Sequence, residues 1–202
     1  PDPVLQQVEH FSTPTTTVND AFRSVSRYWD RITHPEQIIS SLPQAVATML
    51  DPADCGPAFL GLCQDTQEIS FDYPEEFFVE KLNIIPRPRP DLLQVQSALE
   101  IIKNAKKPVI LAGHGVLISQ AYSELKTLAE NAQIPVITTL LGISCFPEDH
   151  VLSAGWPGMH GLAYSSLAID ESDLLIALGM RFDDRITGNP SKFATNSKKI
   201  HV

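Results

Sequence analysis

The amino-acid sequence predicts an α/β protein whose C-terminal half is a Rossmann-like parallel sheet with helices on both faces. Short apolar runs such as "PVILAG" and "DLLIALG" have the length and composition of buried strands. Amphipathic stretches with helical periodicity separate these runs, so successive strands are joined by helical crossovers and lie parallel. The N-terminal half is expected to belong to a separate domain, to which the resemblance described below applies.

The composition is that of an ordinary globular protein and excludes several classes of partner. The chain has 202 residues, of which 43% are hydrophobic and 19% are charged. A formal net charge of −9 with scattered basic residues argues against nucleic acid or an anionic membrane as a partner. No apolar run approaches the roughly 20 residues of a membrane span, and no signal peptide opens the chain.

The cysteines and the two ends of the chain add two expectations. Cys55, Cys63 and Cys145 have no metal-ligand spacing, so we predict reduced, buried thiols in a cytoplasmic protein. The chain starts at Pro1 and stops in the strand-like run "KKIHV". We therefore expect an interior piece of a longer protein.

The domain boundary is predicted in the proline-rich segment 83–91, "NIIPRPRPD". Each proline fixes its own φ and disfavours helix at the preceding residue, so this segment is an extended, stiff linker. One domain then ends within residues 1–82. A second domain, incomplete at its C-terminus, covers residues 92–202.

Three elements are predicted in the first half. Pro35 begins a helix, and the apolar positions of residues 38–50 keep a helical period, with Pro43 predicting a kink or restart. Residues 58–63, "AFLGLC", form a short buried strand. Residues 71–78 are aromatic and acidic, which indicates an irregular segment packed on the domain surface.

The second half alternates helices and strands. The predicted elements are a helix over 92–102, a strand over 108–113, a helix over 122–129, a strand over 135–140, a helix over 162–171 and a strand over 173–179. This order gives a parallel sheet covered on both faces.

Ligands of open parallel sheets bind beyond the carboxyl ends of the strands, so the segments that follow the strands are the candidate site. Glycines allow close backbone approach, free amides and threonine hydroxyls donate to oxygen, and arginine binds phosphate bidentately. Each segment alone can be explained without a ligand, as a tight turn, as ordinary strand composition or as an exposed ion-pair network. The occurrence of all three segments at successive strand ends predicts a nucleotide-shaped ligand. The candidates are Gly113, Gly115, Thr138, Thr139, Leu140, Gly142, Gly179, Arg181, Asp183, Asp184 and Arg185.

A glycine-rich segment, "GWPGMHG" at 155–161, either lines a flat apolar ligand or is a loop with a solvated His160. The sequence has no "GxGxxG" dinucleotide fingerprint, P-loop, "HExxH" or "GxSxG" pattern. The chemistry is therefore expected from a cofactor or from other parts of the protein.

Longer stretches resemble known families. Residues 91–202 closely resemble the central domain of acetolactate synthase large subunits, thiamine-diphosphate enzymes with a structural FAD. The stretches that carry this resemblance are 106–142, "PGMHG" at 157–161 and "IDESDLLIALGMRFDDRITGNPSKFA" at 169–194. Residues 1–80, chiefly 18–67, resemble the later part of the pyrimidine-binding domain of trihydroxycyclohexanedione hydrolases, thiamine-diphosphate enzymes of inositol breakdown. This resemblance implies that residues 1–82 are the C-terminal part of such a domain and thus the end of a second α/β domain.

The acetolactate synthase resemblance implies roles for individual residues. It assigns Asp184 and Arg185 to an ion pair facing the substrate channel, with Arg185 available to a 2-keto acid carboxylate. Asp54 departs from the pattern, because an arginine that reaches FAD is usual there. The implied FAD phosphate and ribose contacts are Gly113, Gly115, Thr138, Thr139, Leu140, Gly179, Arg181 and Asp183, and the implied flavin contacts are Met159, His160 and Gly161.

The resemblances imply an acetolactate-synthase-like condensation of 2-keto acids, with decarboxylation, in branched-chain amino acid biosynthesis. The alternative is hydrolysis of a C–C bond in a cyclic 1,2-dione, and a third possibility is a non-catalytic nucleotide-binding module. Thiamine diphosphate and Mg²⁺ are expected to be bound by parts mostly outside these residues, which supply no catalytic residue and no metal ligand. The chain alone is expected to be inactive, and the full-length enzyme to be a homodimer or homotetramer.

Overall fold

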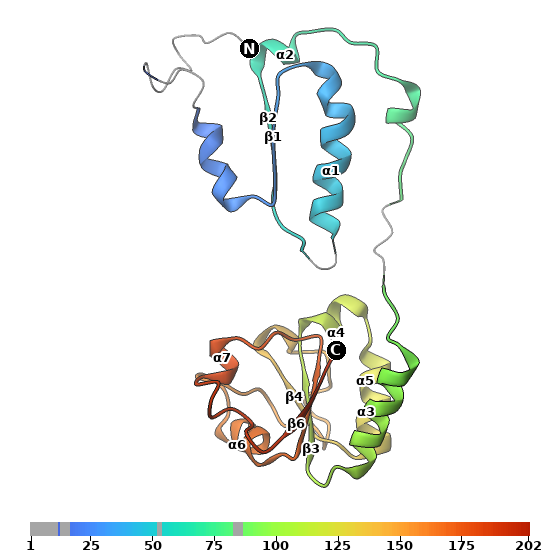
Figure 1. Ribbon diagram of the computed structural model, residues 1–202, viewed down its shortest axis with the longest axis vertical. Coiled ribbons are helices and arrows are strands. Elements are labelled where there is room, and N and C mark those ends of the chain that lie inside the picture. Colours follow the sequence, from blue (N-terminus) through green and yellow to red (C-terminus); the bar gives the residue numbers. More distant parts are fainter. Residues whose placement is uncertain (1–11, 13–16, 52–53, 83–86) are drawn as a thin grey trace. The chain divides into compact units, whose positions relative to one another are not determined.

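The computed structural model describes residue 12 and residues 17–51, 54–82 and 87–202. The chain divides into two compact units, Pro1–Arg89 and Pro90–Val202 (Figure 1). Among the described residues, no helix has the length and apolar character needed to span a membrane.

The first unit contains two parallel strands, β1 (Tyr28–Ile32) and β2 (Ala58–Leu62). The strand β2 confirms the predicted strand, but most of its residues are half-buried and Leu62 is exposed, so the prediction of a buried strand is wrong. The strand β1 was missed because "YWDRI" carries charges in place of an apolar run. Helix α1 (Ile38–Leu50) packs against both strands and runs uninterrupted through Pro43, so the predicted restart is wrong. The short elements are η2 (Val18–Val25), η3 (Pro35–Gln37), α2 (Gln64–Gln67) and η4 (Glu75–Phe77).

Aromatic contacts stabilise the first unit. Phe22 of η2 stacks on Phe59 of β2 with ring centroids 4.8 Å apart, and the Trp29 ring lies 6.1 Å from Phe59. The irregular segment 71–78 forms a second cluster of rings. Its Tyr73 hydroxyl donates to the Pro35 carbonyl oxygen at 3.2 Å, which ties this segment to the start of the helical region.

The second unit is a four-stranded parallel sheet with the order β4-β3-β5-β6. Its strands are β3 (Pro108–Ala112), β4 (Val136–Thr138), β5 (Leu174–Leu178) and β6 (Lys198–His201). After β3 the chain forms β4 on one side of β3 and then crosses to form β5 on the other side. The strands β3 and β5 therefore flank a topological switch point. The predicted Rossmann-like α/β fold is confirmed.

Helices cover both faces of this sheet. On one face α3 (Leu92–Asn104), α4 (His114–Ser119) and α5 (Tyr122–Ala132) pack over a core that includes Ile110 and Ile176. On the other face α6 (Ala163–Glu171) packs over Leu111 and Leu175 through the buried Ile169. Alternate residues of each strand point to opposite faces, which produces the two cores. The short helix α7 (Asp184–Thr187) follows β5.

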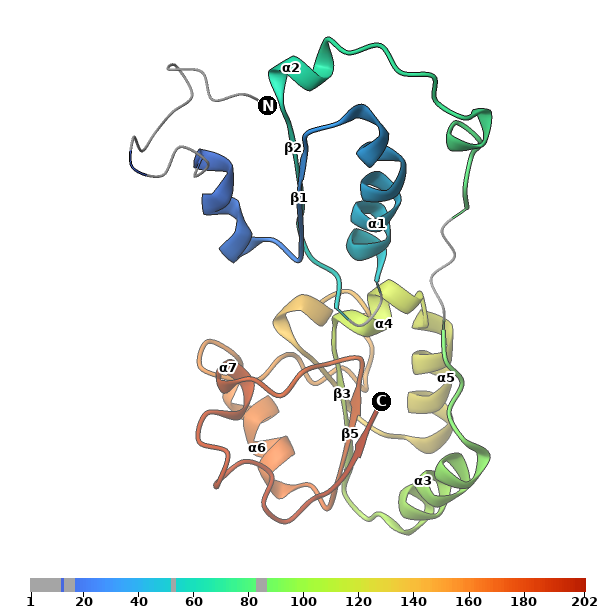
Figure 2. The same cartoon turned by 45° about the horizontal axis from the view of Figure 1, so that its top comes forward.

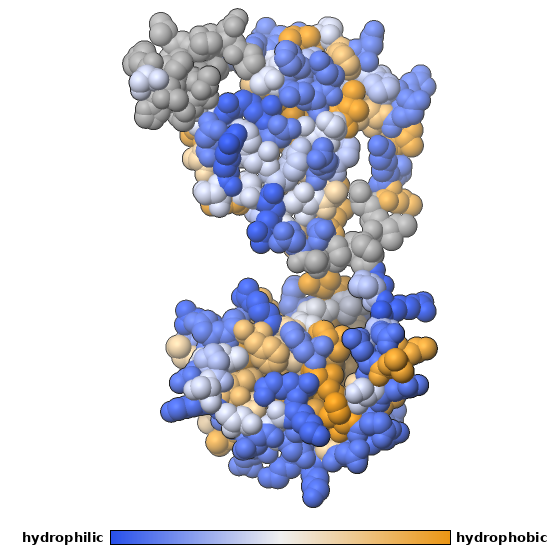
Figure 3. All heavy atoms as spheres, viewed as in Figure 1, coloured by the Kyte–Doolittle hydropathy of each residue, from blue (hydrophilic) through white to orange (hydrophobic). Residues whose placement is uncertain are grey.

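Helix α3 keeps much of its apolar surface exposed. None of its residues is fully buried, and Leu92, Leu93 and Leu99 are exposed, while Ile101 and Ile102 pack partly against the core. Figure 3 shows hydrophobic side chains on the surface over this helix.

The three cysteines occupy different environments. Cys145 is buried, and burial raises the pKa of its thiol to about 11. Cys63 is half-buried and Cys55 is exposed, so the prediction of three buried thiols is wrong for these two. Cys55 lies between α1 and β2.

Candidate functional site

The carboxyl ends of the parallel strands in the second unit form one edge, and the predicted site segments start there. Gly113 follows β3, Thr139 follows β4 and Gly179 follows β5. Figures 1 and 2 both show α4 and α7 at this end of the sheet. The three segments singled out in the sequence therefore do lie at a common edge.

The strand-end glycines pack against one another. A Cβ at Gly113 would lie 2.4 Å from the Met180 Cβ, and one at Gly115 would lie 2.6 Å from the Gly179 Cα. The amides of Gly113 and Gly115 donate to the carbonyl oxygens of Leu178 and Gly179 at 2.8 Å and 2.7 Å. These glycines therefore close the space between β3 and β5 by backbone contact, and close backbone packing explains them without a ligand.

The two threonines are also engaged within the fold. Thr138 and Thr139 are buried, and their amides donate to the carbonyl oxygens of Gly155 and Ala112 at 2.9 Å and 2.8 Å. Leu140 is exposed and begins η5 (Leu140–Gly142). The expectation of free backbone donors at this edge is thus wrong for the two threonines as it is for the two glycines.

Asp183 caps helix α7. Its Oδ1 accepts from the Arg185 amide at 3.1 Å, and its Oδ2 accepts from the Arg181 guanidinium at 3.2 Å. The Arg181 side chain is 86% exposed. Because exposed ion pairs contribute only about 0–1 kcal/mol, the capping bond is the more important of the two contacts for local stability.

The ion pair expected between Asp184 and Arg185 is not formed. No ion pair or hydrogen bond joins their side chains. Successive residues of a helix do not face each other, which explains the outcome for neighbours at the start of α7. Both side chains are exposed and free to contact another molecule.

The segment 155–161 lies against α7 through its backbone. A Cβ at Gly158 would lie 2.4 Å from the Arg185 carbonyl oxygen, and the Met159 amide donates to that same oxygen at 3.4 Å. This contact brings Met159 and Arg185 to one cavity. His160 and Gly161 do not line it.

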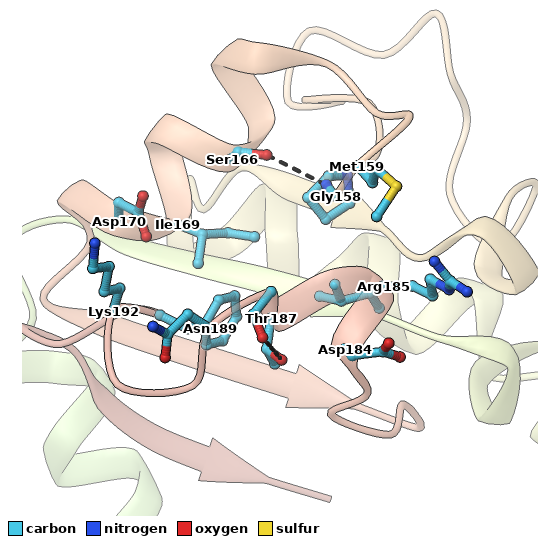
Figure 4. Close-up of a pocket in the computed structure, with 14 residues that line it drawn as sticks. Gly158, Met159, Ser166, Ile169, Asp170, Asp184, Arg185, Thr187, Asn189 and Lys192 are labelled. Atoms are coloured by element: carbon cyan, nitrogen blue, oxygen red, sulfur yellow. Dashed lines mark hydrogen bonds between the residues drawn. The ribbon is translucent and has the colours of Figure 1, made fainter.

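That cavity, of about 330 Å³, lies between α6, α7 and the segment 188–193 (Figure 4). Its volume falls within the range of about 300–1,000 Å³ typical of small-molecule sites. Apolar side chains and four charged groups share its lining. The apolar residues are Pro157, Met159, Ile169, Ile186 and Phe193, and the charged residues are Asp170, Asp184, Arg185 and Lys192.

One polar atom of each uncharged polar side chain in the cavity already has a hydrogen-bond partner. The Ser166 Oγ accepts from the Gly158 amide at 3.3 Å, and the Thr187 hydroxyl donates to the Asp183 carbonyl oxygen at 3.0 Å. The Asn189 Oδ1 accepts from the Ser191 amide at 3.0 Å. The charged groups are therefore the main polar groups left for a ligand.

Sequence reasoning found Met159, Asp184 and Arg185 but missed the opposite wall. Ser166 and Asp170 are four apart on α6 and share one helix face, which helical spacing could have indicated. Lys192 and Phe193 come from an irregular segment that returns toward α6, and no local pattern predicts that return.

A family model described as the central domain of thiamine pyrophosphate enzymes matches residues 95–202. The chain belongs to the thiamine pyrophosphate enzymes. The resemblance to this superfamily is thereby confirmed, and its central domain coincides with the second unit apart from the first residues of that unit.

Thiamine pyrophosphate enzymes among the curated proteins resemble the chain over nearly its whole length. The 3D-(3,5/4)-trihydroxycyclohexane-1,2-dione hydrolase of Bacillus subtilis is 41% identical over 200 residues, which cover 99% of this chain and 31% of that protein. The protein of the same name from Listeria monocytogenes serotype 4b is 40% identical over 202 residues, which cover 100% of this chain and 32% of that protein. The protein of that name from Clostridium perfringens strain 13 is 40% identical over 193 residues, which cover 96% of this chain and 30% of that protein. The chain thus spans about a third of the length of these curated relatives.

The described residues contain no cluster of metal-ligating side chains for the metal ion of the cofactor that gives these enzymes their name. The Mg²⁺ that accompanies a diphosphate needs oxygen ligands, usually carboxylates. Across residues 17–51, 54–82 and 87–202, no three His, Cys, Asp or Glu side chains gather where they could hold a metal ion. One or two carboxylates are enough for a Mg²⁺ that a diphosphate and water also ligate, so the place of the diphosphate-Mg²⁺ site stays a prediction.

Asp54, which departs from the FAD pattern, has its partners in its own unit. Its carboxylate pairs with the Arg27 guanidinium at 3.1 Å, and its amide donates to the Asp51 Oδ1 at 2.7 Å. The aspartate thus stabilises the turn before β2. FAD binding remains a prediction, and the engaged backbone amides at the strand ends give it no support.

Proposed function

We propose that the chain forms part of a thiamine-diphosphate-dependent hydrolase that opens a cyclic 1,2-dione. The observation that carries this proposal is identity of 39–41% to the hydrolases over 96–100% of the chain, through both units. The resemblance to acetolactate synthase rests on residues 91–202 alone. The hydrolase therefore accounts for more of the sequence.

The proposed reaction cleaves the bond between two adjacent carbonyl carbons with one water molecule. One carbon gains the hydroxyl group and becomes a carboxylic acid, and the other gains a hydrogen and becomes an aldehyde. Thiamine diphosphate would supply the nucleophilic carbon for such a cleavage. We propose that parts outside this chain bind that cofactor and that the chain alone is inactive. In support, no three His, Cys, Asp or Glu side chains gather among the described residues where they could hold a metal ion.

In this proposal the second unit contributes substrate contacts at the α6–α7 cavity. Among the described residues no carboxylate pairs with the Arg185 guanidinium, which is suited to a carbonyl oxygen of the dione or to the carboxylate of the ring-opened acid. Asp184 and Met159 lie at the same end of the cavity (Figure 4). Asp183 and Arg181 keep the helix-capping role described above.

The test compares two substrates in the full-length protein. Purified enzyme with thiamine diphosphate and Mg²⁺ is incubated with 3D-(3,5/4)-trihydroxycyclohexane-1,2-dione or with pyruvate, and the products are identified by NMR. We expect a ring-opened acid from the dione and no acetolactate from pyruvate. Acetolactate formation without ring opening would overturn the proposal.

Acetolactate synthase activity is the second candidate, favoured by the likeness of residues 106–142 and 169–194 to that family's central domain. The flavin distinguishes the two, because the resemblance implies FAD only for the synthase. Full-length protein purified without added flavin is denatured and its supernatant examined for flavin fluorescence. Stoichiometric FAD would favour the synthase, and its absence together with ring opening would favour the hydrolase.

A further inference from the structure

The α6–α7 cavity has an unassigned end, formed by Asp170 of α6 and Lys192 of the segment 188–193. In Figure 4 the ammonium and the carboxylate point toward each other from opposite walls, with Ile169 beside them. No ion pair joins Lys192 to a carboxylate of the described chain. The Asp170 Oδ1 accepts only a long bond of 3.4 Å from the Ala194 amide. A donor and an acceptor therefore face each other across a gap that neither spans.

A hydroxyl group is suited to that gap. It accepts a hydrogen bond from an ammonium and donates one to a carboxylate, so one ligand hydroxyl satisfies both groups. A carboxylate or phosphate in the same place would pair with Lys192 but would be repelled by Asp170. The Asp170–Lys192 pair thus selects hydroxyl over anionic groups.

The whole lining supports the same choice of ligand. Its two carboxylates and two cations, Asp170, Asp184, Arg185 and Lys192, balance in charge, which gives a dianionic diphosphate no net attraction. Ile169, Ile186 and Phe193 offer an apolar surface on which the C–H face of a saturated ring can lie. Apolar walls with a few convergent polar groups are typical of sites for small molecules.

We propose that this cavity binds a neutral polyhydroxylated six-membered ring, with one ring hydroxyl between Asp170 and Lys192. The inference rests on the proposed function in that the trihydroxylated dione is such a ring. It assigns substrate binding to Asp170 and Lys192, in addition to Arg185.

Binding can be measured without turnover, using myo-inositol as the probe and full-length protein loaded with thiamine diphosphate and Mg²⁺. The affinity is determined by calorimetric titration for the wild type and for Lys192→Met, Asp170→Asn and the double variant. Lys103→Met is the matched control, because Lys103 lies on α3 over the opposite face of the sheet. We expect each cavity variant to bind about tenfold more weakly and the control to be unchanged.

The double variant provides the sharpest part of the test. If one hydroxyl bridges the two side chains, either substitution removes the bridge, so the double variant should bind no more than about threefold more weakly than the singles. Independent tenfold losses that multiply would overturn the bridging arrangement. Unchanged affinity for myo-inositol, or loss of ADP or FAD binding in its place, would overturn the choice of ligand.

The outcomes also separate this inference from the proposed function. Weaker myo-inositol binding in the cavity variants, together with no ring opening of the dione by the wild type, would leave the polyol site standing and refute the hydrolase. Ring opening with the same KM in the wild type and in Lys192→Met would support the hydrolase and refute the site.

Discussion

The two sides of the β5 carboxyl end use glycine in different ways. Toward β3, Gly179 meets Gly115 so closely that a Cβ on either would lie within 2.7 Å of the other's backbone. Toward α6, Gly188 also has positive φ, at +55°, but a Cβ there would meet nothing within 4 Å. One side of the strand is closed by backbone packing, and the other borders a cavity.

This difference teaches how to interpret a glycine at a strand end. The short spacing of Gly113 and Gly115 predicts close approach of something to the backbone, and that something is the neighbouring strand end. The ligand-sized space opens on the side where charged side chains follow the strand. In this domain the close-spaced glycines thus mark backbone packing, and the charged side chains that follow β5 mark the cavity.

The largest effect is expected from Gly179→Ala. Positive φ costs an alanine about 1–3 kcal/mol, and the clash with the Gly115 backbone adds about 1–3 kcal/mol. Gly188→Ala has the backbone cost alone. Hydrogen exchange of the β3 and β5 amides in the full-length protein should therefore show a greater loss of protection for Gly179→Ala. Equal losses in the two variants would mean that packing does not distinguish the two sides.

The effects of Arg185→Ala and Arg181→Ala on activity compare a residue that lines the cavity with one that lies outside it. Arg185 lines the cavity without an ion pair, whereas Arg181 lies outside it and is 86% exposed. Loss of a substrate-positioning group costs up to about 10²-fold. We expect kcat/KM for the dione to fall about 10- to 100-fold in Arg185→Ala and less than about twofold in Arg181→Ala. The reverse order would place the substrate outside the cavity.

Asp183→Ala tests how the cavity wall is held. Removal of an N-cap aspartate costs about 0.5–2 kcal/mol, and the helix in question carries Asp184 and Arg185. Exchange of the amides in residues 184–188 should accelerate in Asp183→Ala. Asp183→Asn is the control, because asparagine is an equally good cap, and it should retain most of the protection. Similar acceleration in both variants would contradict a capping role.

The sequence predicted β3, β4 and β5 of the second unit well because each of these strands lies in a local apolar run. It missed β1 and α7, whose residues are mixed or charged and whose conformation depends on pairing with β2 and on the Asp183 cap. Part of the cavity lining could be predicted in the same way, because Met159, Asp184 and Arg185 belong to local motifs. The wall formed by Lys192 depends on the path of the chain after α7, which local sequence does not specify.

The smallest effect is expected at the opposite end of the same strands, where Asp173 joins the starts of β3 and β5. Its carboxylate accepts from the amides of Lys106 and Lys107 at 2.6 Å and 2.8 Å. These bonds hold the pKa of Asp173 below its ordinary value. A carboxyl group whose pKa is lowered by folding stabilises the protein fully above its unfolded pKa of about 3.9. That stabilisation disappears as the pH falls through the lower folded pKa.

Asp173→Asn should therefore be less stable than the wild type at neutral pH, and the difference should shrink as the pH falls below about 4. Thermal unfolding of the full-length protein at a series of pH values measures this convergence. Glu171→Gln is the control, because Glu171 is exposed and pairs only with the Lys107 side chain at 3.5 Å, so its substitution should change little at any pH. If the difference in unfolding temperature between Asp173→Asn and the wild type stayed constant down to acid pH, the hydrogen bonds from the Lys106 and Lys107 amides would not depend on the charge of Asp173. The amino ends of β3 and β5 would then be held together by the backbone ladder alone.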